Sequence, residues 1–490
     1  MTAPRAASRL VSWIGWAGLE AIGRLALLTG STIIFSRLLA PRDFGVTALV
    51  LTIVATAAIF VGSPFEEALT QRRYLRGAHV RAALSVSWLI GAVLVALSIL
   101  AGSTLSRLYG AEEIAVLLPV AMASVFFSGH SDIVTALARR RRRFNDVAIA
   151  TLAGHAVGVA ASLALAFAGY GLWALIGQRL LVVTARAIIL QWRIGGLVTP
   201  SLSLAPARDL GRFSRYSFLA RLTENVAYLA FNNLVQAFYG VAALGQVNMA
   251  MRLIEPIRGA ITATSHNLAF SFLARANRDP ARFATLAQTI ASQSAFVSTP
   301  IFVGMAAVAP TLLPLVAGPG WEDAIPIAVC LSLASALAVP SGLIYTALSA
   351  NGRPEFSLYS LVGGFVAIVL VLVGCSALGP ISLGLSRLAG DAVRAGVAIG
   401  VSPVHLGWTR RGRLQALWPA WALAALMGAM VFLADGALPA RGPAPHLAFM
   451  IVIGVIAYAT LVSLFAKTMF QTLKAHLAQA SAPFMRKFAR

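Results

Sequence analysis

Two arginines and a glutamate share one face of a segment that is otherwise apolar. Arg252, Glu255 and Arg258 follow one another at intervals of three residues within 241–272, and this spacing places all three side chains on one side of a helix. Two cations beside one anion leave a positive charge that needs another partner. Arginine can bind two oxygens of a phosphate at once through its planar guanidinium. This face therefore predicts a binding site for an anionic substrate.

Charged and polar residues also occur in three other apolar segments. They are Glu20 and Arg24 in 12–38, Arg221, Glu224 and Asn225 in 213–239, and Arg387, Asp391 and Arg394 in 381–403. An arginine that faces lipid at the bilayer centre costs about 2.5–3.5 kcal/mol, so these side chains are expected to face a polar interior. Ion pairs that lock helices together are the alternative for each cluster, and they are the favoured interpretation for Arg387, Asp391 and Arg394. We expect the substrate to be bound by Arg24, Arg252, Arg258, Arg221 and Asn225. We expect ion pairing or ion coupling by Glu255, Glu20, Glu224 and Asp391.

These charges stand out because the chain is strongly apolar. Hydrophobic residues make up 59% of its 490 residues and charged residues only 11%, whereas soluble proteins have about 25% charged residues. A stretch of about 20 apolar residues crosses the hydrocarbon core of a bilayer. The sequence contains about 14 stretches of this kind, at 12–38, 44–62, 81–102, 114–137, 146–168, 172–192, 213–239, 241–272, 284–309, 324–349, 356–377, 381–403, 414–435 and 446–466.

Basic residues gather in alternate connections between these stretches. One set of connections carries the run 139–143 and most of the other basic residues, whereas the opposite set carries only Arg42, Arg107 and Arg441. Short loops rich in Lys and Arg stay in the cytoplasm, so both termini are predicted to be cytoplasmic. This orientation signal explains the net charge of +22 without nucleic acid as a partner. For the run 139–143, binding of anionic lipid head groups is the alternative to orientation.

The organisation of the chain predicts two halves. The long connection 193–212 contains glycines and prolines, and the stretches 43–50 (DFGVTALV) and 243–250 (ALGQVNMA) form a faint internal repeat. Parallel repeats of six helices are a known transporter architecture. We expect an all-α polytopic membrane protein with six-helix bundles at 1–212 and 213–404. Two more helices and a basic amphipathic tail at the membrane surface follow in 405–490.

Five stretches resemble the polysaccharide transporter family of the multidrug/oligosaccharidyl-lipid/polysaccharide exporter superfamily. They are SRLLAPRDFGVTALVLTIVATAAIF (36–60), EEALTQRRYL (66–75), ALARRRRRFNDVAI (136–149), GYGLWALIGQRLL (169–181) and APTLLPLVAGPGWEDAIPIAVCLSLA (309–334). The resemblance implies two bundles that form a V around a cationic cavity and open alternately to the two sides. It also implies transport of undecaprenyl-diphosphate-linked oligosaccharide across the bacterial inner membrane for O-antigen, capsule or exopolysaccharide. Polysaccharide polymerase and chain-length proteins would then be partners, in addition to membrane lipids.

Two other functions remain open at this point. A cation-coupled drug or lipid exporter of the same superfamily would need a cavity dominated by carboxylates. A membrane-embedded glycosyltransferase or polymerase would need acidic catalytic residues and large outer loops, and Glu322 and Asp323 are the main acidic pair available. The sequence contains no P-loop and no H-E-x-x-H motif, so we expect neither an enzyme nor a cofactor. Coupling to H⁺ or Na⁺ is expected to involve Glu255 first and Glu20 second.

Overall fold

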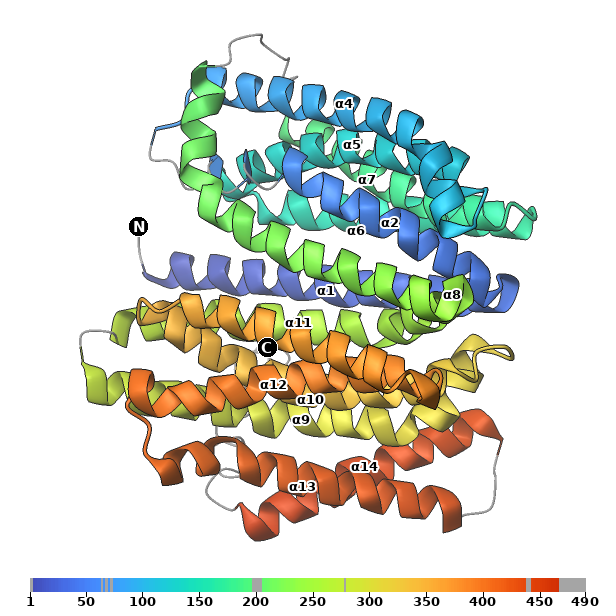
Figure 1. Ribbon diagram of the computed structural model, residues 1–490. Coiled ribbons are helices and arrows are strands. Elements are labelled where there is room, and N and C mark those ends of the chain that lie inside the picture. Colours follow the sequence, from blue (N-terminus) through green and yellow to red (C-terminus); the bar gives the residue numbers. More distant parts are fainter. Residues whose placement is uncertain are drawn as a thin grey trace, which may run out of the picture. The chain divides into compact units, whose positions relative to one another are not determined.

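The computed structural model is built from long helices (Figure 1) and describes residues 3–62, 65–66, 69–70, 74–195, 205–276, 279–437 and 442–466. The helices are α1 (Ala3–Leu38), α2 (Pro41–Val61), α4 (Gly77–Tyr109), α5 (Ile114–Arg140), α6 (Phe144–Phe167), α7 (Leu172–Ile194), α8 (Ala205–Ala276), α9 (Pro280–Ala317), α10 (Ala324–Ala350), α11 (Glu355–Gly374), the short 3-10 helix η1 (Ser376–Leu378), α12 (Ile381–Leu406), α13 (Arg410–Ala437) and α14 (Pro443–Phe465). Among the described residues, eleven helices are long and apolar enough to cross a membrane. The predicted all-α, multi-pass fold is therefore confirmed.

Helix α8 joins two of the predicted segments. Its backbone leaves the helical conformation at Gly240, where φ is 82° and ψ is 174°, between the predicted segments 213–239 and 241–272. Glycine adopts a positive φ without the steric cost that other residues meet. The two predicted segments are therefore joined by a kink within one helix. With α8 counted as two segments, each predicted stretch has a helix of its own.

The chain forms two compact units, Met1–Arg252 (unit 1) and Leu253–Arg490 (unit 2). Their boundary lies inside α8, because the middle of this helix packs with α2: the buried Asn232 donates a hydrogen bond from Nδ2 to Thr52 Oγ1 at 2.7 Å. The sequence places a boundary at residue 212 instead, and the division at 212 and 404 stays a prediction. In unit 2, α13 and α14 pack against α9. The predicted amphipathic tail lies outside the described residues.

The internal repeat has a structural counterpart in unit 1. A methyl group added at Gly45 would overlap the carbonyl oxygen of Val241, and one added at Gly245 would overlap the carbonyl oxygen of Pro41. In the alignment of 43–50 with 243–250, Gly45 corresponds to Gly245 and Pro41 to Val241. The starts of α2 and of the second half of α8 thus contact each other through matching residues in both directions. Each copy of the repeat needs its glycine for this approach.

The start of α2 explains one of the family-like stretches. Pro41 occupies the first turn of the helix, where the missing N–H costs nothing. Asp43 Oδ2 accepts a hydrogen bond from the backbone N–H of Ala40 at 3.1 Å, which satisfies a donor just before the helix. Together with Gly45, these residues make 41–45 a helix start that also serves as a contact surface.

We expect Gly45→Ala to destabilise the protein although alanine favours helices by about 1 kcal/mol over glycine. The new methyl group must displace the α8 backbone at Val241, and overpacking of this kind costs about 1–3 kcal/mol. Thermal unfolding of the purified protein measures the difference. Gly30→Ala in α1 is the control, because a methyl group there meets nothing within 4 Å. Equal stability of the two variants would contradict the tight contact.

Candidate functional site: a charge row in unit 2 and a separate arginine in unit 1

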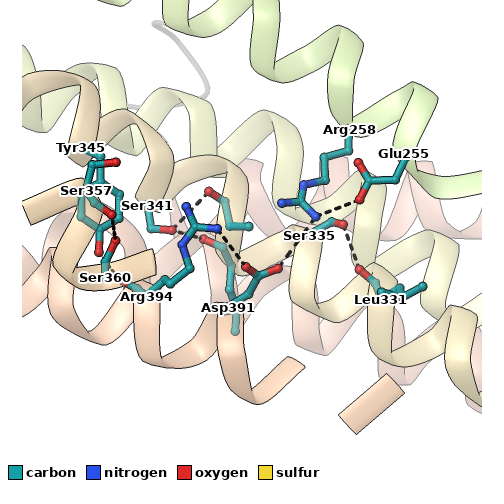
Figure 2. Close-up of polar contacts among 12 residues, drawn as sticks. Glu255, Arg258, Leu331, Ser335, Ser341, Tyr345, Ser357, Ser360, Asp391 and Arg394 are labelled. Atoms are coloured by element: carbon teal, nitrogen blue, oxygen red, sulfur yellow. Dashed lines mark hydrogen bonds and ion pairs between the residues drawn. The ribbon is translucent and has the colours of Figure 1, made fainter. Parts of the chain in front are cut away.

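Four charged side chains of alternating sign form a row between α8 and α12 (Figure 2). Arg258 Nη1 lies 3.1 Å from Glu255 Oε1 of the same helix and 3.8 Å from Asp391 Oδ2 of α12. Asp391 Oδ1 in turn lies 3.7 Å from Arg394 Nη1. We call Glu255, Arg258, Asp391 and Arg394 the charge row. Because it contains two cations and two anions, it is electrically balanced.

The equal number of positive and negative charges in the charge row changes the interpretation of Arg258. In the sequence, Glu255 is the single carboxylate on the helix face that carries Arg252 and Arg258. The structure brings a second carboxylate, Asp391, from a distant segment to Arg258. Arg258 therefore has carboxylate partners on two helices. Its assignment to substrate binding stays a prediction, and its observed contacts are those of a residue that holds α8 and α12 together.

Small residues bring the members of the charge row close to the neighbouring helices. A methyl group at Gly390 would lie 3.0 Å from the carbonyl oxygen of Gly364 in α11. A methyl group at Gly364 would lie 2.8 Å from Arg394 Cγ, so the arginine stem crosses α11 at this glycine. From the other side, Tyr345 of α10 donates a hydrogen bond from its hydroxyl to the carbonyl oxygen of Arg394 at 2.6 Å. Asp391 is thereby enclosed, and its side chain is only 7% exposed.

Arg252 has different surroundings from Arg258. Its Nε donates a hydrogen bond to Asn248 Oδ1 at 2.9 Å, and its guanidinium carbon lies 5.2 Å from the centre of the Phe44 ring. An arginine over an aromatic face is held by a cation–π attraction. Within the part of the chain that the structure describes, no carboxylate forms an ion pair with Arg252. Of the two arginines on this face of α8, Arg252 is thus the one without an ion pair among the described residues, and its assignment to substrate binding stays a prediction.

The remaining predicted residues all lie in unit 1. Arg24, Arg221 and Glu224 are exposed, and Glu20 is half-buried. Asn225 donates a hydrogen bond from Nδ2 to the carbonyl oxygen of Arg221 at 3.0 Å. Among the described residues, no ion pair joins Glu20 to Arg24, so the helix-locking alternative for this pair has no contact to support it. Their assignments to binding and coupling stay predictions.

Unit 1 contains a second group of charged residues, for which no function was predicted from the sequence. Asp132 of α5 lies among Glu66, Arg139, Arg179 and Arg186. Arg186 Nη2 donates to Thr135 Oγ1 at 3.0 Å, and Arg139 Nη1 pairs with Glu66 Oε1 at 2.6 Å. In the sequence, this group is indicated by Arg179 and Arg186, which lie two helical turns apart in α7. Their carboxylate neighbour, Asp132, comes from another helix, so the sequence does not connect it with them.

Of the acidic pair Glu322 and Asp323, Glu322 has a structural role at the start of α10. Glu322 Oε1 accepts a hydrogen bond from the backbone N–H of Gly320 at 3.0 Å, and this bond lowers the pKa of Glu322. The neighbouring Trp321 is 1% exposed, so the turn is anchored by burial of the ring. A carboxylate whose pKa is lowered in this way is a weak proton donor near neutral pH.

Solved structures with the same arrangement of helices are membrane transporters. A structure titled "Lipid II flippase MurJ, inward closed conformation" aligns with a TM-score of 0.76 over 94% of this chain and 99% of that chain, at 12% identity. An inward-facing multidrug resistance MATE family transporter of the MOP superfamily aligns with a TM-score of 0.63 over 79% of this chain and 98% of that chain, at 17% identity. The chain thus shares its fold with these two multi-pass membrane proteins.

Comparisons with known sequences identify the family of the protein. Residues 34–326 match the family described as "Polysaccharide biosynthesis protein", and the chain belongs to this family. It is also 24% identical over 351 residues to "Succinoglycan biosynthesis transport protein ExoT" of Rhizobium meliloti (strain 1021), covering 69% of each chain. The resemblance inferred from the five stretches is confirmed. The protein is thus a multi-pass membrane protein of a polysaccharide biosynthesis family.

Proposed function

We propose that the protein carries an undecaprenyl-diphosphate-linked oligosaccharide across the bacterial inner membrane by alternating access. The family supports a role in polysaccharide synthesis, and the observation that carries the substrate class is the state of Arg252. This arginine belongs to an apolar segment and has an amide and an aromatic ring as neighbours instead of a carboxylate. A cation in such surroundings favours an anionic ligand.

The geometry of Arg252 suits a diphosphate. The hydrogen bond to Asn248 uses Nε, which leaves the two terminal nitrogens of the guanidinium to bind phosphate oxygens in pairs. The Phe44 ring restricts the plane of the guanidinium. Arg24, Arg221 and Asn225 are proposed to contact the same head group or its sugars once the substrate has entered. The polymerase and the chain-length proteins are proposed partners on the receiving side.

We expect Arg252→Ala to abolish surface polysaccharide while the amount of protein in the membrane stays normal, because the diphosphate loses its main charged contact. Arg24→Ala and Arg258→Ala are expected to act in the same direction. Arg252→Lys should restore only part of the polysaccharide, since an ammonium lacks the paired geometry of a guanidinium. The measurement is complementation of a strain that lacks the gene. Arg353→Ala, which removes an arginine from an exposed ion pair with Glu355, is the control.

The outcomes separate the alternatives. Normal polysaccharide in all three alanine variants would reject the assignment of the head-group site. Export of cationic drugs by the wild-type protein, at a rate that does not change in Arg252→Ala, would instead favour the drug exporter.

The proposed orientation has its own test. We propose that both termini lie in the cytoplasm, as the alternation of basic connections predicts. A reporter that is active only in the periplasm should be active when fused at Gly171, before α7, or at Gly379, before α12. The same reporter should be silent at Arg141 and Arg353. The reverse pattern would overturn the orientation.

A further inference from the structure

Unit 1 contains a cavity of about 510 Å³ enclosed by α4, α5 and α7. Helix α5 packs against both of the other helices (Figure 1). The side chains that matter here are Trp88 of α4, Phe126 and His130 of α5, and Ile188, Gln191 and Trp192 of α7. We call this space the aromatic cavity. None of its lining residues belongs to the predicted substrate site.

The aromatic cavity is apolar and open at one edge. Trp88 stacks on Phe126 with ring centroids 4.9 Å apart, which gives one wall a flat and rigid surface. At the edge, Ile188 is 62% exposed and Trp192 is 80% exposed. Contact with such apolar surfaces is more favourable in free energy for a hydrocarbon chain than for water. The cavity therefore suits an alkyl chain that enters from its open edge.

Positive charge lies at the end of the cavity wall. Arg143 Nη1 donates to the carbonyl oxygen of Ile194 at 3.4 Å, and the following residue, Gly195, lines the cavity. Arg143 and Arg193 both pair with Asp146, at 2.6 Å and 2.8 Å. The turn that begins after α5 is thus fixed against the end of α7.

Two arginines of this turn lack a carboxylate partner within the described residues. Arg141 and Arg142 are exposed, and among the described residues neither forms an ion pair. Their neighbours Arg139 and Arg143 are paired with Glu66 and Asp146. Exposed positive charge is therefore available to a ligand at Arg141 and Arg142.

The spacing of charge and cavity fits one lipid. Along α5, the distance from His130 to Arg141 is about 16 Å at 1.5 Å per residue, close to the roughly 15 Å depth of one leaflet of the hydrocarbon core. We propose that unit 1 binds an anionic phospholipid, with its phosphate at Arg141 and Arg142 and an acyl chain in the aromatic cavity. The predicted orientation of the protein in the membrane explains why the run 139–143 is basic. It does not require an apolar cavity next to this run. The proposal does not depend on which substrate is transported.

Native mass spectrometry of the full-length protein tests the proposal with added phosphatidylglycerol and phosphatidylcholine of identical acyl chains. The wild type should retain phosphatidylglycerol preferentially. The double variant Arg141→Gln/Arg142→Gln should weaken this retention by about 10–25-fold, because each arginine near an anionic head group contributes about fivefold. Trp192→Ala should weaken retention of both lipids, since it removes one edge of the cavity.

Matched controls come from unit 2. Arg282→Gln/Arg411→Gln removes two exposed arginines, and Trp418→Ala removes a tryptophan that is 63% exposed. Neither control should change lipid retention. Losses in the controls as large as those in the test variants would overturn the proposal, as would equal retention of the two lipids by the wild type. Displacement of bound phosphatidylglycerol by a polyprenyl phosphate at equal concentration would show that the cavity holds the carrier lipid instead, and would also overturn it.

Discussion

Replacement of Asp391 by asparagine should lower the stability of the protein by about 3–5 kcal/mol, because loss of one member of a buried ion pair leaves the other charge unmatched. Asp391 is 7% exposed and is the anion shared by Arg258 and Arg394. Asparagine has the same shape, so packing is kept and the effect reports the charge. Thermal or denaturant unfolding of the purified protein measures the loss.

Two further variants show whether the charge row is the cause. Glu355→Gln removes the anion of an exposed pair with Arg353, whose side chains are 37% and 55% exposed, and exposed pairs contribute about 0–1 kcal/mol. The double variant Asp391→Asn/Arg394→Gln should regain part of the stability, because one unmatched cation is removed with the anion. A loss of stability in Asp391→Asn that is no larger than the loss in Glu355→Gln would show that the charge row does not stabilise the protein.

Replacement of Glu255 by glutamine should have a different result, because Glu255 is the accessible carboxylate of the row. Its side chain is 40% exposed, and Arg258 keeps Asp391 as a partner when Glu255 loses its charge. We propose that proton coupling passes through Glu255. In proteoliposomes, coupling of one proton should let each pH unit of gradient shift the steady-state ratio of substrate between the two sides by about tenfold in the wild type, with a matching rise in net flux. Glu255→Gln should keep its flux without a gradient and lose this response.

The coupling experiment has two comparisons. Glu20→Gln tests the second candidate, and Glu355→Gln controls for loss of an exposed carboxylate outside the row. Substrate binding should be unchanged in Glu255→Gln, which separates coupling from the head-group site at Arg252. Wild-type flux that ignores both the pH gradient and the membrane potential would exclude the proposal. A response to a sodium gradient alone would assign the coupling ion to Na⁺.

Several features of the protein could be predicted from the sequence because they depend on neighbouring residues. The length of each apolar stretch sets a spanning helix, since the bilayer has a fixed thickness. The i, i+3 spacing of Glu255 and Arg258 was enough to predict that the two side chains share one face of a helix, because the geometry of a helix fixes that distance. The family resemblance also rests on local stretches, such as the helix start at 41–45, where Pro41 and Asp43 act within one turn.

Other features were decided by the packing of helices far apart in the chain. Asp391 of α12 meets Arg258 of α8, a helix far away in the chain, and this contact changed Arg258 from an unmatched cation to a paired one. The contact of Gly45 with Val241 and of Gly245 with Pro41 gave the faint repeat a structural meaning that its letters did not carry. The aromatic cavity, likewise, depends on three helices whose sequences show no shared pattern. A helix fixes which side chains share its face, but the rotation and depth of one helix against another depend on the whole packed interface, so the partners of a charge within the membrane follow only from the tertiary structure.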